Sequence, residues 1–543
     1  MKDLLIEFDD LPDEILIYIF KKLYNDQVLY SLMGVNQRLN RVIQDTIFTR
    51  DLCLREYSPV DDSTFPLPDP ILDRFCSKIL PEIGHQIETL HLKGISIEPV
   101  LHATNYPNLN SLDLCDIHFK QAMSLFFDEN PLPHIFKNKI TSLFINFKNG
   151  NKSALMGGIC SIMFSKMFTI FTNLRCLKFN PSSSVCNALS LNMTPETDIS
   201  LTLLELHITV SDMEECLYIL DGRFDQLRIF YVTCYSVLSC SLNIEHKEKV
   251  LANLRIFSLW CKHKIYHFDQ SIVPLLRRML NLEELDLNLT AHCYENFIDG
   301  DTLKKDILIY IPQLYKFTFN ICSTIAHLNQ TNSSLNEHIQ TTFKYFSNNE
   351  IITSIDHFQE EAYSQCHIYS CPYKWKFYNN ITNNFRGGLF TTVTEVSVYD
   401  ECPFEYQFFL RIAQSFPFMK ELTIGNRKAQ NKKQFIKSNN NNQLLSIIEY
   451  PNLNRLDLSN TDDFYVELFL FHMNMSLPNN LHLCVEYQSL KRVTYYFTRY
   501  KTRSNCAKLA ALYFDVVDQI NENVKYYFPN TCIFHTTDFK LSK

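Results

Sequence analysis

The sequence predicts an α/β protein in which a small all-helical N-terminal segment precedes a long array of repeated strand–helix units. The strongest observation is a duplicated segment, Tyr-Pro-Asn-Leu-Asn-x-Leu-Asp-Leu, which occupies residues 106–114 and again residues 450–458. Looser copies lie between them. The last two apolar positions alternate with a polar one, as a strand with one buried face requires. A repeat at a roughly fixed period decides the fold before any other feature does.

The repeat consists of three apolar positions with two residues and then one residue between them. Successive copies from Leu90 to Phe317 are 22 to 34 residues apart. The copies begin at Ile87, Leu109, Ile140, Leu174, Leu203, Leu227, Leu254, Leu282, Leu314, Val393, Met419 and Leu453, with fainter ones near Leu481 and Leu509. In many copies an amide residue directly precedes the first apolar position: Asn108, Asn173, Gln226, Asn253, Asn281, Gln313 and Asn452.

This interval holds one strand, one helix and two turns, so the array resembles the leucine-rich repeat in its longer, irregular form. The resemblance implies a solenoid over residues 84–530, with parallel strands on the concave face and helices outside. No clean copy lies at about residues 321–391, where an aromatic cluster predicts one or two degenerate repeats with an insertion. Lysine and asparagine in residues 426–443 predict a solvated, mobile loop, with a basic recognition patch as the alternative.

Residues 11–50 predict three short helices. Pro12 suits the first turn of a helix, and Asp13 and Glu14 lie at the positive end of its dipole. Asn25 and Asn36 can cap the second and third helices. Such a unit is too small to be very stable alone, so it is expected to complete its core on a partner.

The order and spacing of these residues resemble an F-box, over about residues 8–55. The pattern reads Leu11-Pro12-x-Glu14-Ile15-Leu16-x-x-Ile19-Phe20-x-x-Leu23 and then Leu29-x-x-Leu32-x-x-Val35-Asn36-x-Arg38-Leu39. The resemblance implies docking on the Skp-type adaptor of a cullin–RING ubiquitin ligase. It assigns the adaptor contacts to Leu11, Pro12, Leu16, Ile19, Phe20, Leu29, Val35 and Arg38. Leu39 departs from the family, in which many members carry tryptophan. The alternative is that these residues are the core of a helical cap on the array.

Four prolines between Pro59 and Pro70 predict a linker over residues 56–83, ending in a bridging helix at about Ile71–Ile83.

Composition excludes several classes of function. The net charge of −8, from 51 basic and 59 acidic residues, argues against a nucleic-acid-binding protein. The 18 cysteines lack a disulfide framework, and the sequence starts without a signal peptide or membrane span, so we expect a cytoplasmic or nuclear protein. No phosphate loop, nucleophile motif or zinc spacing occurs, so we expect no enzyme activity, metal or cofactor. The nearest metal-like groups are Cys261, His263 and His267, and Cys366, His367 and Cys371.

The residue between the last two apolar positions of each strand projects from the face opposite the helices. These residues are of mixed charge and partly aromatic, as protein-binding surfaces are. The candidate substrate-binding residues are Phe144, Lys178, His207, Tyr231, Asp286 and Asp457, together with Trp260 and Tyr399 one pleat onward.

The sequence thus predicts a substrate-recognition subunit of a Skp–cullin–F-box-type ubiquitin ligase, a monomer within a hetero-complex. It would hold an unknown protein substrate near the ligase without performing the bond chemistry. The alternative is a repeat scaffold with no link to ubiquitination.

Overall fold

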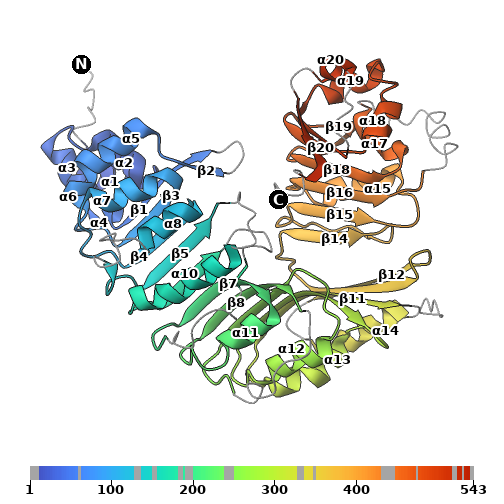
Figure 1. Cartoon of the computed structure of the whole chain (residues 1–543), viewed down its shortest axis with the longest axis horizontal. Helices are drawn as coiled ribbons and strands as arrows, with labels where there is room; N and C mark the ends of the chain where they lie inside the picture. The colour runs from blue at the N-terminus through green and yellow to red at the C-terminus, as the bar shows by residue number, and fades with distance from the viewer. Residues whose placement is uncertain are drawn as a thin grey trace, which may run out of the picture. The chain divides into compact units, whose positions relative to one another are not determined.

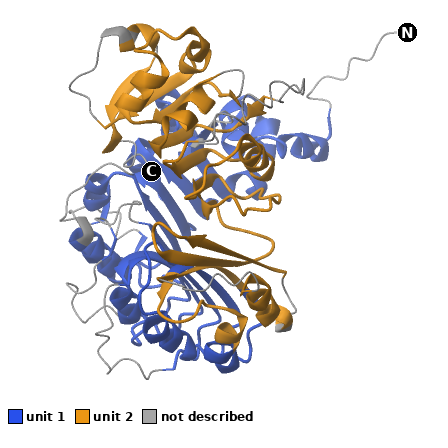
Figure 2. Ribbon diagram, turned by 90° about the vertical axis from the view of Figure 1, so that its right-hand side faces the viewer, with its two compact units in different colours: residues 1–290, 305–317 blue, residues 291–304, 318–543 orange. Residues whose placement is uncertain are grey.

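The structure is a computed structural model of the 543-residue chain, and it has two compact units. Unit 1 contains residues 1–290 and 305–317, and unit 2 contains residues 291–304 and 318–543 (Figure 2). The structure describes residues 11–58, 63–126, 136–148, 156–180, 188–189, 200–237, 250–326, 335–346, 350–429, 447–471, 475–515, 522–528 and 531–537. Most of the loop expected at residues 426–443 therefore lies outside the described residues.

Unit 1 begins with four short helices (Figure 1). Asn36 caps the third as the sequence predicts, because its side chain accepts a hydrogen bond from the Leu39 N–H (2.7 Å). Asn25 does not cap the second; its amide instead donates to the carbonyl of Asp51 (3.1 Å) and so ties the helices to the first strand. The helices are α1 (Asp13–Phe20), α2 (Asn25–Leu32), α3 (Gln37–Ile43) and α4 (Thr46–Thr49).

The rest of unit 1 is a sheet with strand order β2-β1-β3-β4-β5-β6-β7-β8-β9-β10. All neighbours from β1 to β10 run parallel, and only β2 is antiparallel to β1. The strands are β1 (Asp51–Ser58), β2 (Ser63–Pro66), β3 (Thr89–Lys93), β4 (Ser111–Ile117), β5 (Ser142–Phe147), β6 (Cys176–Asn180), β7 (Glu205–Asp212), β8 (Ile229–Ser236), β9 (Ile256–Cys261) and β10 (Glu284–Cys293).

The strand register matches the repeat found in the sequence. The middle apolar residues of successive copies are directly paired across neighbouring strands and are buried: Leu90, Leu112, Leu143, Leu177, Leu206, Phe230, Phe257 and Leu285. Because side chains alternate along a strand, one face of the sheet carries this apolar set and the other carries the variable residues. The copies therefore form equivalent strands, one beside the next.

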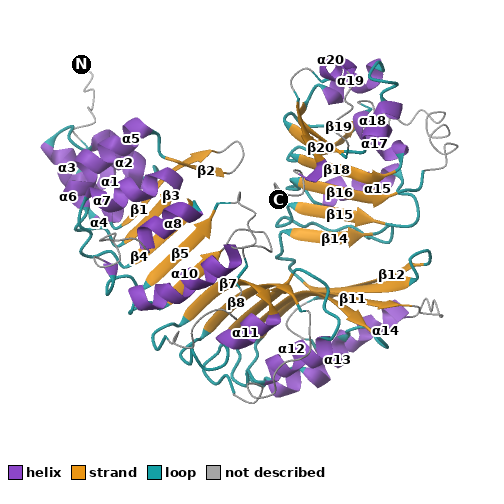
Figure 3. Cartoon of the chain, in the orientation of Figure 1, coloured by secondary structure: helices purple, strands orange, loops and turns teal. Residues whose placement is uncertain are grey.

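Helices cover the apolar face of this sheet (Figure 3). They bury their own apolar stripes there, as α12 (Phe268–Arg277) does with Ile272 and Leu276. The described helices that follow α4 in unit 1 are α5 (Asp69–Arg74), the π-helical η2 (Phe75–Ile79), α6 (Leu80–Ile83), η3 (Gly94–Ser96), α7 (Ile97–Ala103), α8 (Phe119–Phe126), α10 (Met156–Ile170), α11 (Met213–Ile219), α12 and η7 (Leu308–Tyr310).

The turns before the strands repeat the same hydrogen bonds. The N–H groups of Leu204 and Glu205 both donate to the carbonyl of Arg175, at 2.8 and 2.9 Å, and those of Arg228 and Ile229 share the Leu204 carbonyl in the same way. The amide residue that precedes the first apolar position donates to a carbonyl of the preceding turn. These bonds join Asn108 to His85, Asn173 to Asn138, Asn253 to Asp225, Asn281 to Ala252 and Asn452 to Pro417.

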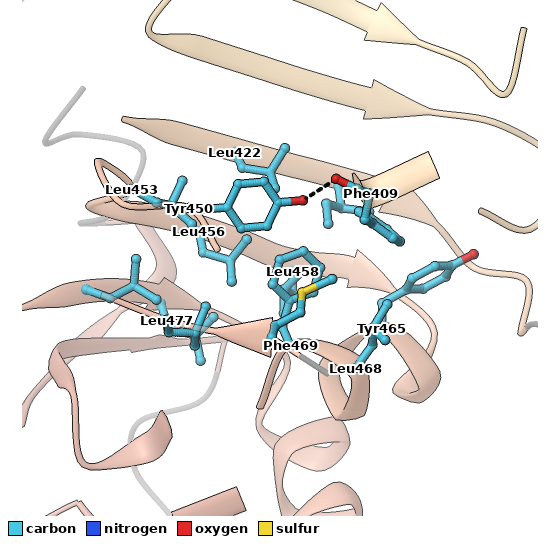
Figure 4. Packing of buried hydrophobic residues seen from close by; sticks show 14 of the residues in the cluster. Phe409, Leu422, Tyr450, Leu453, Leu456, Leu458, Tyr465, Leu468, Phe469 and Leu477 are labelled. Atoms are coloured by element: carbon cyan, nitrogen blue, oxygen red, sulfur yellow. Dashed lines mark hydrogen bonds between the residues drawn. The ribbon is translucent and has the colours of Figure 1, made fainter. Parts of the chain in front are cut away.

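The two near-identical segments make the same contact in their respective units. The hydroxyl of buried Tyr106 donates to the carbonyl of Val100 in α7 (2.6 Å). That of buried Tyr450 donates to the carbonyl of Phe409 in helix α15 (Tyr406–Ser415), at 3.0 Å (Figure 4). Each tyrosine ties a helix to the turn before the next strand and so satisfies its own buried hydroxyl.

Unit 2 contains an antiparallel group and a parallel sheet. The antiparallel strands have the order β12-β13-β11, and the parallel sheet has the order β14-β15-β16-β18-β20-β21-β22. The strands are β11 (Lys316–Ala326), β12 (Ile351–Phe358), β13 (Tyr363–Ser370), β14 (Phe377–Ile381), β15 (Glu395–Tyr399), β16 (Glu421–Asn426), β18 (Arg455–Thr461), β20 (Leu481–Cys484), β21 (Leu509–Phe514) and β22 (Cys532–His535), with a small pair β17 (Ile448–Glu449) and β19 (Met475–Ser476).

The helices of this part flank these strands. They are α13 (Gly300–Asp306), α14 (Leu335–Thr342), η8 (Phe343–Tyr345), α15 (Tyr406–Ser415), α17 (Asp463–Leu470), α18 (Tyr487–Val493), α19 (Tyr500–Cys506) and α20 (Glu522–Tyr527).

Two regions differ from the sequence prediction. The expected linker at residues 56–83 starts inside β1, whose Leu52 and Leu54 pair with Leu90 and Leu92 of β3, so strand pairing begins at Asp51. Residues 321–391 contain the antiparallel pair β12–β13 and a packed group of aromatic rings at the start of the second sheet. Antiparallel pairing is absent from the predicted all-parallel array, and it arises because a tight turn joins β12 directly to β13.

Candidate functional site

Helix α1 carries apolar side chains on two sides. Leu16 and Phe20 are buried against the other helices, whereas Ile15 and Ile19 on the neighbouring side are 46% and 37% exposed. Tyr18 and Leu23 extend this exposed set. Positions 15, 18 and 19 are one turn apart and form a continuous strip. The helix therefore presents an apolar surface that the described residues do not cover.

The structure separates seven of the eight predicted adaptor contacts into two groups, and the eighth, Arg38, forms bonds within the helical segment. Pro12, Ile19 and Val35 are exposed and Leu11 is partly exposed, so these four are accessible to a partner. Leu16, Phe20 and Leu29 are no more than 2% exposed and form the helical core. In this chain those three side chains hold the helices together, and a direct contact with a partner would require them to leave that core.

Arg38 has a structural role at the start of α1. Its Nε and Nη2 atoms lie 2.8 and 2.7 Å from the Asp13 carboxylate, and its guanidinium also donates to the carbonyl of Leu11. These bonds fix the segment from Leu11 to Asp13 against α3. Arg38 thereby orients the exposed strip.

The adaptor contacts predicted from the sequence did not include three exposed apolar residues of this surface, which are Ile15, Tyr18 and Leu23. Their signal is the width of the apolar stripe, which runs over Ile15, Leu16, Ile19, Phe20 and Leu23 and is wider than one short helix can bury.

A second candidate surface is the face of the unit 1 sheet that carries the variable residues. Five predicted residues of this unit are brought together in one row across adjacent strands, with Ser258 between the last two. The pairing runs Phe144, Lys178, His207, Tyr231, Ser258, Asp286. Trp260 lies one pleat onward on β9, paired with Thr233 of β8.

Side chains of this row are ordered by contacts with one another. The rings of His207 and Tyr231 stack with centroids 4.3 Å apart. His207 Nε2 lies 2.6 Å from the carboxylate of Glu205, which also lies 3.6 Å from Lys178 Nζ. Partial burial outweighs the nearby carboxylate and lowers the pKa of His207, so this ring is neutral at pH 7. The centre of the row is a flat aromatic surface with charged groups beside it.

The start of the same face carries an ionic network. Asp113 lies 2.8 Å from both Arg55 and His91, and His91 also lies 3.1 Å from Asp51. The hydrogen bond to Asp113 raises the pKa of His91, while burial opposes it. For Asp113, His91 and Arg55 outweigh the effect of burial and lower the pKa of the carboxyl. The repeat spacing places His91 and Asp113 at equivalent positions of neighbouring strands, whereas their contacts with Arg55 and Asp51 are found only in the structure.

The two remaining predicted residues lie in unit 2. Tyr399 donates to the carboxylate of Glu361. Asp457 is 9% exposed and accepts hydrogen bonds from the N–H (3.0 Å) and hydroxyl (2.7 Å) of Ser459. Both side chains therefore bond within their own sheet or its neighbouring loop, and Asp457 has little surface to offer to a partner.

Within the described ranges, no group of three or more His, Cys, Asp or Glu side chains is placed to hold a metal ion. In the same part of the chain, no helix is long and apolar enough to span a membrane.

Comparison with known proteins identifies the N-terminal segment. The family described as F-box-like matches residues 8–55. Among solved structures, the chain is similar to one described as "Crystal structure of Rad7 and Elc1 complex in yeast", with 13% sequence identity, 87% of each chain covered and a TM-score of 0.23. No curated protein matches the chain.

Proposed function

We propose that the chain is the substrate-recognition subunit of a Skp–cullin–F-box-type ubiquitin ligase. The observation that carries this proposal is the F-box-like match over residues 8–55, in which α1 presents an uncovered apolar strip. An exposed apolar surface on a small helical unit is typical of a site for a partner protein.

The proposed adaptor contacts are Leu11, Pro12, Ile15, Ile19 and Val35. Leu11 and Pro12 lie just before α1, and Ile15 and Ile19 lie within it. Val35 is 59% exposed in the turn before α3. Burying an isoleucine or valine side chain contributes about 1.5–3 kcal/mol, so a few such contacts supply most of a stable complex. Leu16, Phe20 and Leu29 support this surface from inside, and Arg38 fixes its start.

The strand array is the proposed substrate-binding part, and we assign it to the leucine-rich-repeat class. Its paired apolar positions, the repeated turn hydrogen bonds and the helices on one face support that assignment. We place the substrate on the row around His207 and Tyr231, because tyrosine and histidine rings offer large contact area with little conformational freedom to lose.

In this proposal the chain performs no bond chemistry. It holds the substrate close to the ligase and so raises the effective concentration of the substrate lysines at the catalytic end of the complex. The complex would act in the cytoplasm or nucleus with one copy of the chain. The alternative is a scaffold that binds a protein through the array, with the helices acting only as a cap.

The direct experiment compares adaptor binding by two exposed double variants. Ile15→Asp with Ile19→Asp places two charges in the proposed interface, and we expect binding to a purified Skp-type adaptor to fall at least about 100-fold. The matched control is Ile162→Asp with Ile309→Asp, which charges two isoleucines exposed elsewhere in unit 1. Equal binding by the two double variants would exclude α1 as the docking surface and favour the scaffold.

Substrate capture is tested separately. Proximity labelling with and without proteasome inhibition identifies proteins that accumulate near the chain only when degradation is blocked. His207→Ala with Tyr231→Ala is expected to remove those proteins while the adaptor stays bound. If the labelled set is unchanged by this variant, substrate binding takes place elsewhere.

A further inference from the structure

Unit 2 contains a cavity of about 340 Å³ that the proposed function does not use. It lies where the antiparallel group meets the start of the parallel sheet, and it is lined by β12, β13 and β14, by residue 336 of α14 and by the loop at residues 382–387. A volume of this size is at the lower end of small-ligand sites and accommodates one long side chain.

The polar centre of the cavity is Asp356, whose side chain belongs to β12 and is 4% exposed. Its carboxylate accepts hydrogen bonds from the Thr382 hydroxyl (2.7 Å), the Asn384 amide (2.8 Å) and the Ser354 hydroxyl (3.4 Å). All three donors are neutral. Within the described part of the chain no lysine, arginine or histidine is among the groups that act on Asp356, and burial raises the pKa of this carboxyl.

Such an arrangement is unusual because a buried carboxylate without a cation is destabilising. Charged side chains in protein interiors are ordinarily paired. Groups of this kind, located in a cavity wall, are frequent at binding sites. The missing component is a positive charge.

The remaining walls suit a cation. Tyr369 and Tyr378 line the cavity with their rings 5.8 Å apart, and His367 packs edge-on to Tyr378 at 5.2 Å. Aromatic rings attract cations, and desolvation strengthens this attraction. His367 adds no competing charge, because burial lowers its pKa to about 4 and it is hydrogen-bonded to Asn320 Oδ1 (2.6 Å).

Arg386 also lines the cavity, but it is exposed. A guanidinium at this position weakens the attraction for a cation, but solvent around the exposed side chain reduces this repulsion.

We propose that this cavity binds a guanidinium or ammonium group, either from an arginine or lysine side chain of a bound peptide or from a small free amine. The cation pairs with Asp356 and lies against the rings of Tyr369 and Tyr378. This binding site is independent of the adaptor surface on α1, and the proposal does not rest on the ligase function.

The test is a calorimetric titration of the full-length chain with a pair of isosteric ligands. N-acetyl-arginine amide carries the cation, and N-acetyl-citrulline amide replaces it with a neutral urea group of the same shape. We expect the arginine derivative to bind at least about tenfold more tightly, since a charge-assisted hydrogen bond to a buried group contributes at least this much. Equal affinities for the two ligands would overturn the proposal.

Three variants locate the ligand. Asp356→Asn keeps an oxygen that can accept the bonds from Thr382 and Asn384 but removes the charge, and we expect it to lose the preference for arginine over citrulline. Glu350→Gln is the matched control, because Glu350 is an exposed carboxylate just before β12 that does not line the cavity. Arg386→Gln, at an exposed site, is expected to strengthen binding of the cation severalfold.

Agmatine, which is arginine without its carboxylate, distinguishes the sources. Tighter binding of the peptide-like derivative than of agmatine indicates a peptide side chain, and the reverse indicates a small free amine; both results support a cation site if citrulline is rejected. Arginine binding that neither Asp356→Asn nor Arg386→Gln alters would place the ligand elsewhere and overturn the proposal.

Discussion

The N-terminal helices and the strand array use apolar residues in opposite ways. Helix α1 buries Leu16 and Phe20 but leaves Ile15, Tyr18 and Ile19 exposed, whereas α12 of the array buries most of its apolar residues against the sheet. In the array the exposed face is built from polar and aromatic residues of variable type. In the proposed function, the adaptor site is therefore recognised by its exposed apolar surface, and the substrate site by its variable polar and aromatic residues.

The largest effect is expected in the core of the array. Leu285 of β10 is buried and is paired with Phe257 of the neighbouring strand. Leu285→Ala leaves a cavity there, so we expect the free energy of unfolding to fall by about 2–5 kcal/mol. Ile19→Ala on α1 is expected to change it by less than about 0.5 kcal/mol. Urea denaturation of both variants measures the contrast, and equal losses would show that α1 is packed as the array is.

A second effect depends on pH and is confined to unit 2. Burial lowers the pKa of His367 to about 4, so the unfolded chain binds a proton there at a higher pH than the folded chain does. The stability is therefore complete above about pH 6.5 and declines as pH falls toward 4, by roughly 3 kcal/mol in all. Asp356, whose pKa burial raises, acts in the opposite sense at the acidic end.

His367→Gln is expected to flatten this decline, because glutamine does not gain a proton in the same range. Thermal unfolding at half-unit steps from pH 7.5 to 4.5 measures it. An unchanged pH profile would mean that His367 is not held neutral by burial.

A smaller effect distinguishes the amide residues of the repeat. Asn253→Ala removes the bond from its side chain to the Asp225 carbonyl (2.7 Å), and we expect a loss of about 1 kcal/mol. Gln226 occupies the same place in the preceding copy, and its side chain forms no hydrogen bond with any residue that the structure describes. Gln226→Ala is therefore the control, expected to cost less than about 0.3 kcal/mol. Equal losses in chemical denaturation would show that the amide bond contributes nothing specific.

The smallest change in the free energy of unfolding is expected for the double variant that should weaken adaptor binding most. Ile15→Asp with Ile19→Asp changes only exposed positions, so the free energy of unfolding is expected to stay within about 0.5 kcal/mol of the parent. A larger loss, seen in the same denaturation experiment, would mean that these side chains belong to the helical core and not to a docking surface.

The sequence predicted the positions of many strands, because a strand with one buried face needs apolar residues at alternate positions. The copies at Leu203 and Leu227 became β7 and β8 in the register that the skeleton requires. The amide residues before the first apolar position were a visible signal, but the carbonyl that each one binds lies a whole repeat earlier. Only the structure supplies that partner.

Other features were less predictable. Leu16 and Ile19 look alike in a stripe that is wider than α1 can bury, and only the packing of α2 to α4 decides which of them is inside. Strand β1 was not predicted, because the prolines that follow it suggested a linker. Leu52 and Leu54 nevertheless have the alternating apolar spacing of a strand. The cation cavity depends on Asp356 and Tyr378, which pairing and packing bring together across two sheets.

The most direct test of the central claim is amide hydrogen exchange of the full-length chain with and without a saturating Skp-type adaptor. Exchange reports protection residue by residue, so it compares the two regions in one experiment. We predict that exchange slows at least about tenfold in α1 and in the turn before α3, and that β7, β8 and β9 are unchanged. Protection confined to the strand array, or no protection in α1, would contradict the proposed function.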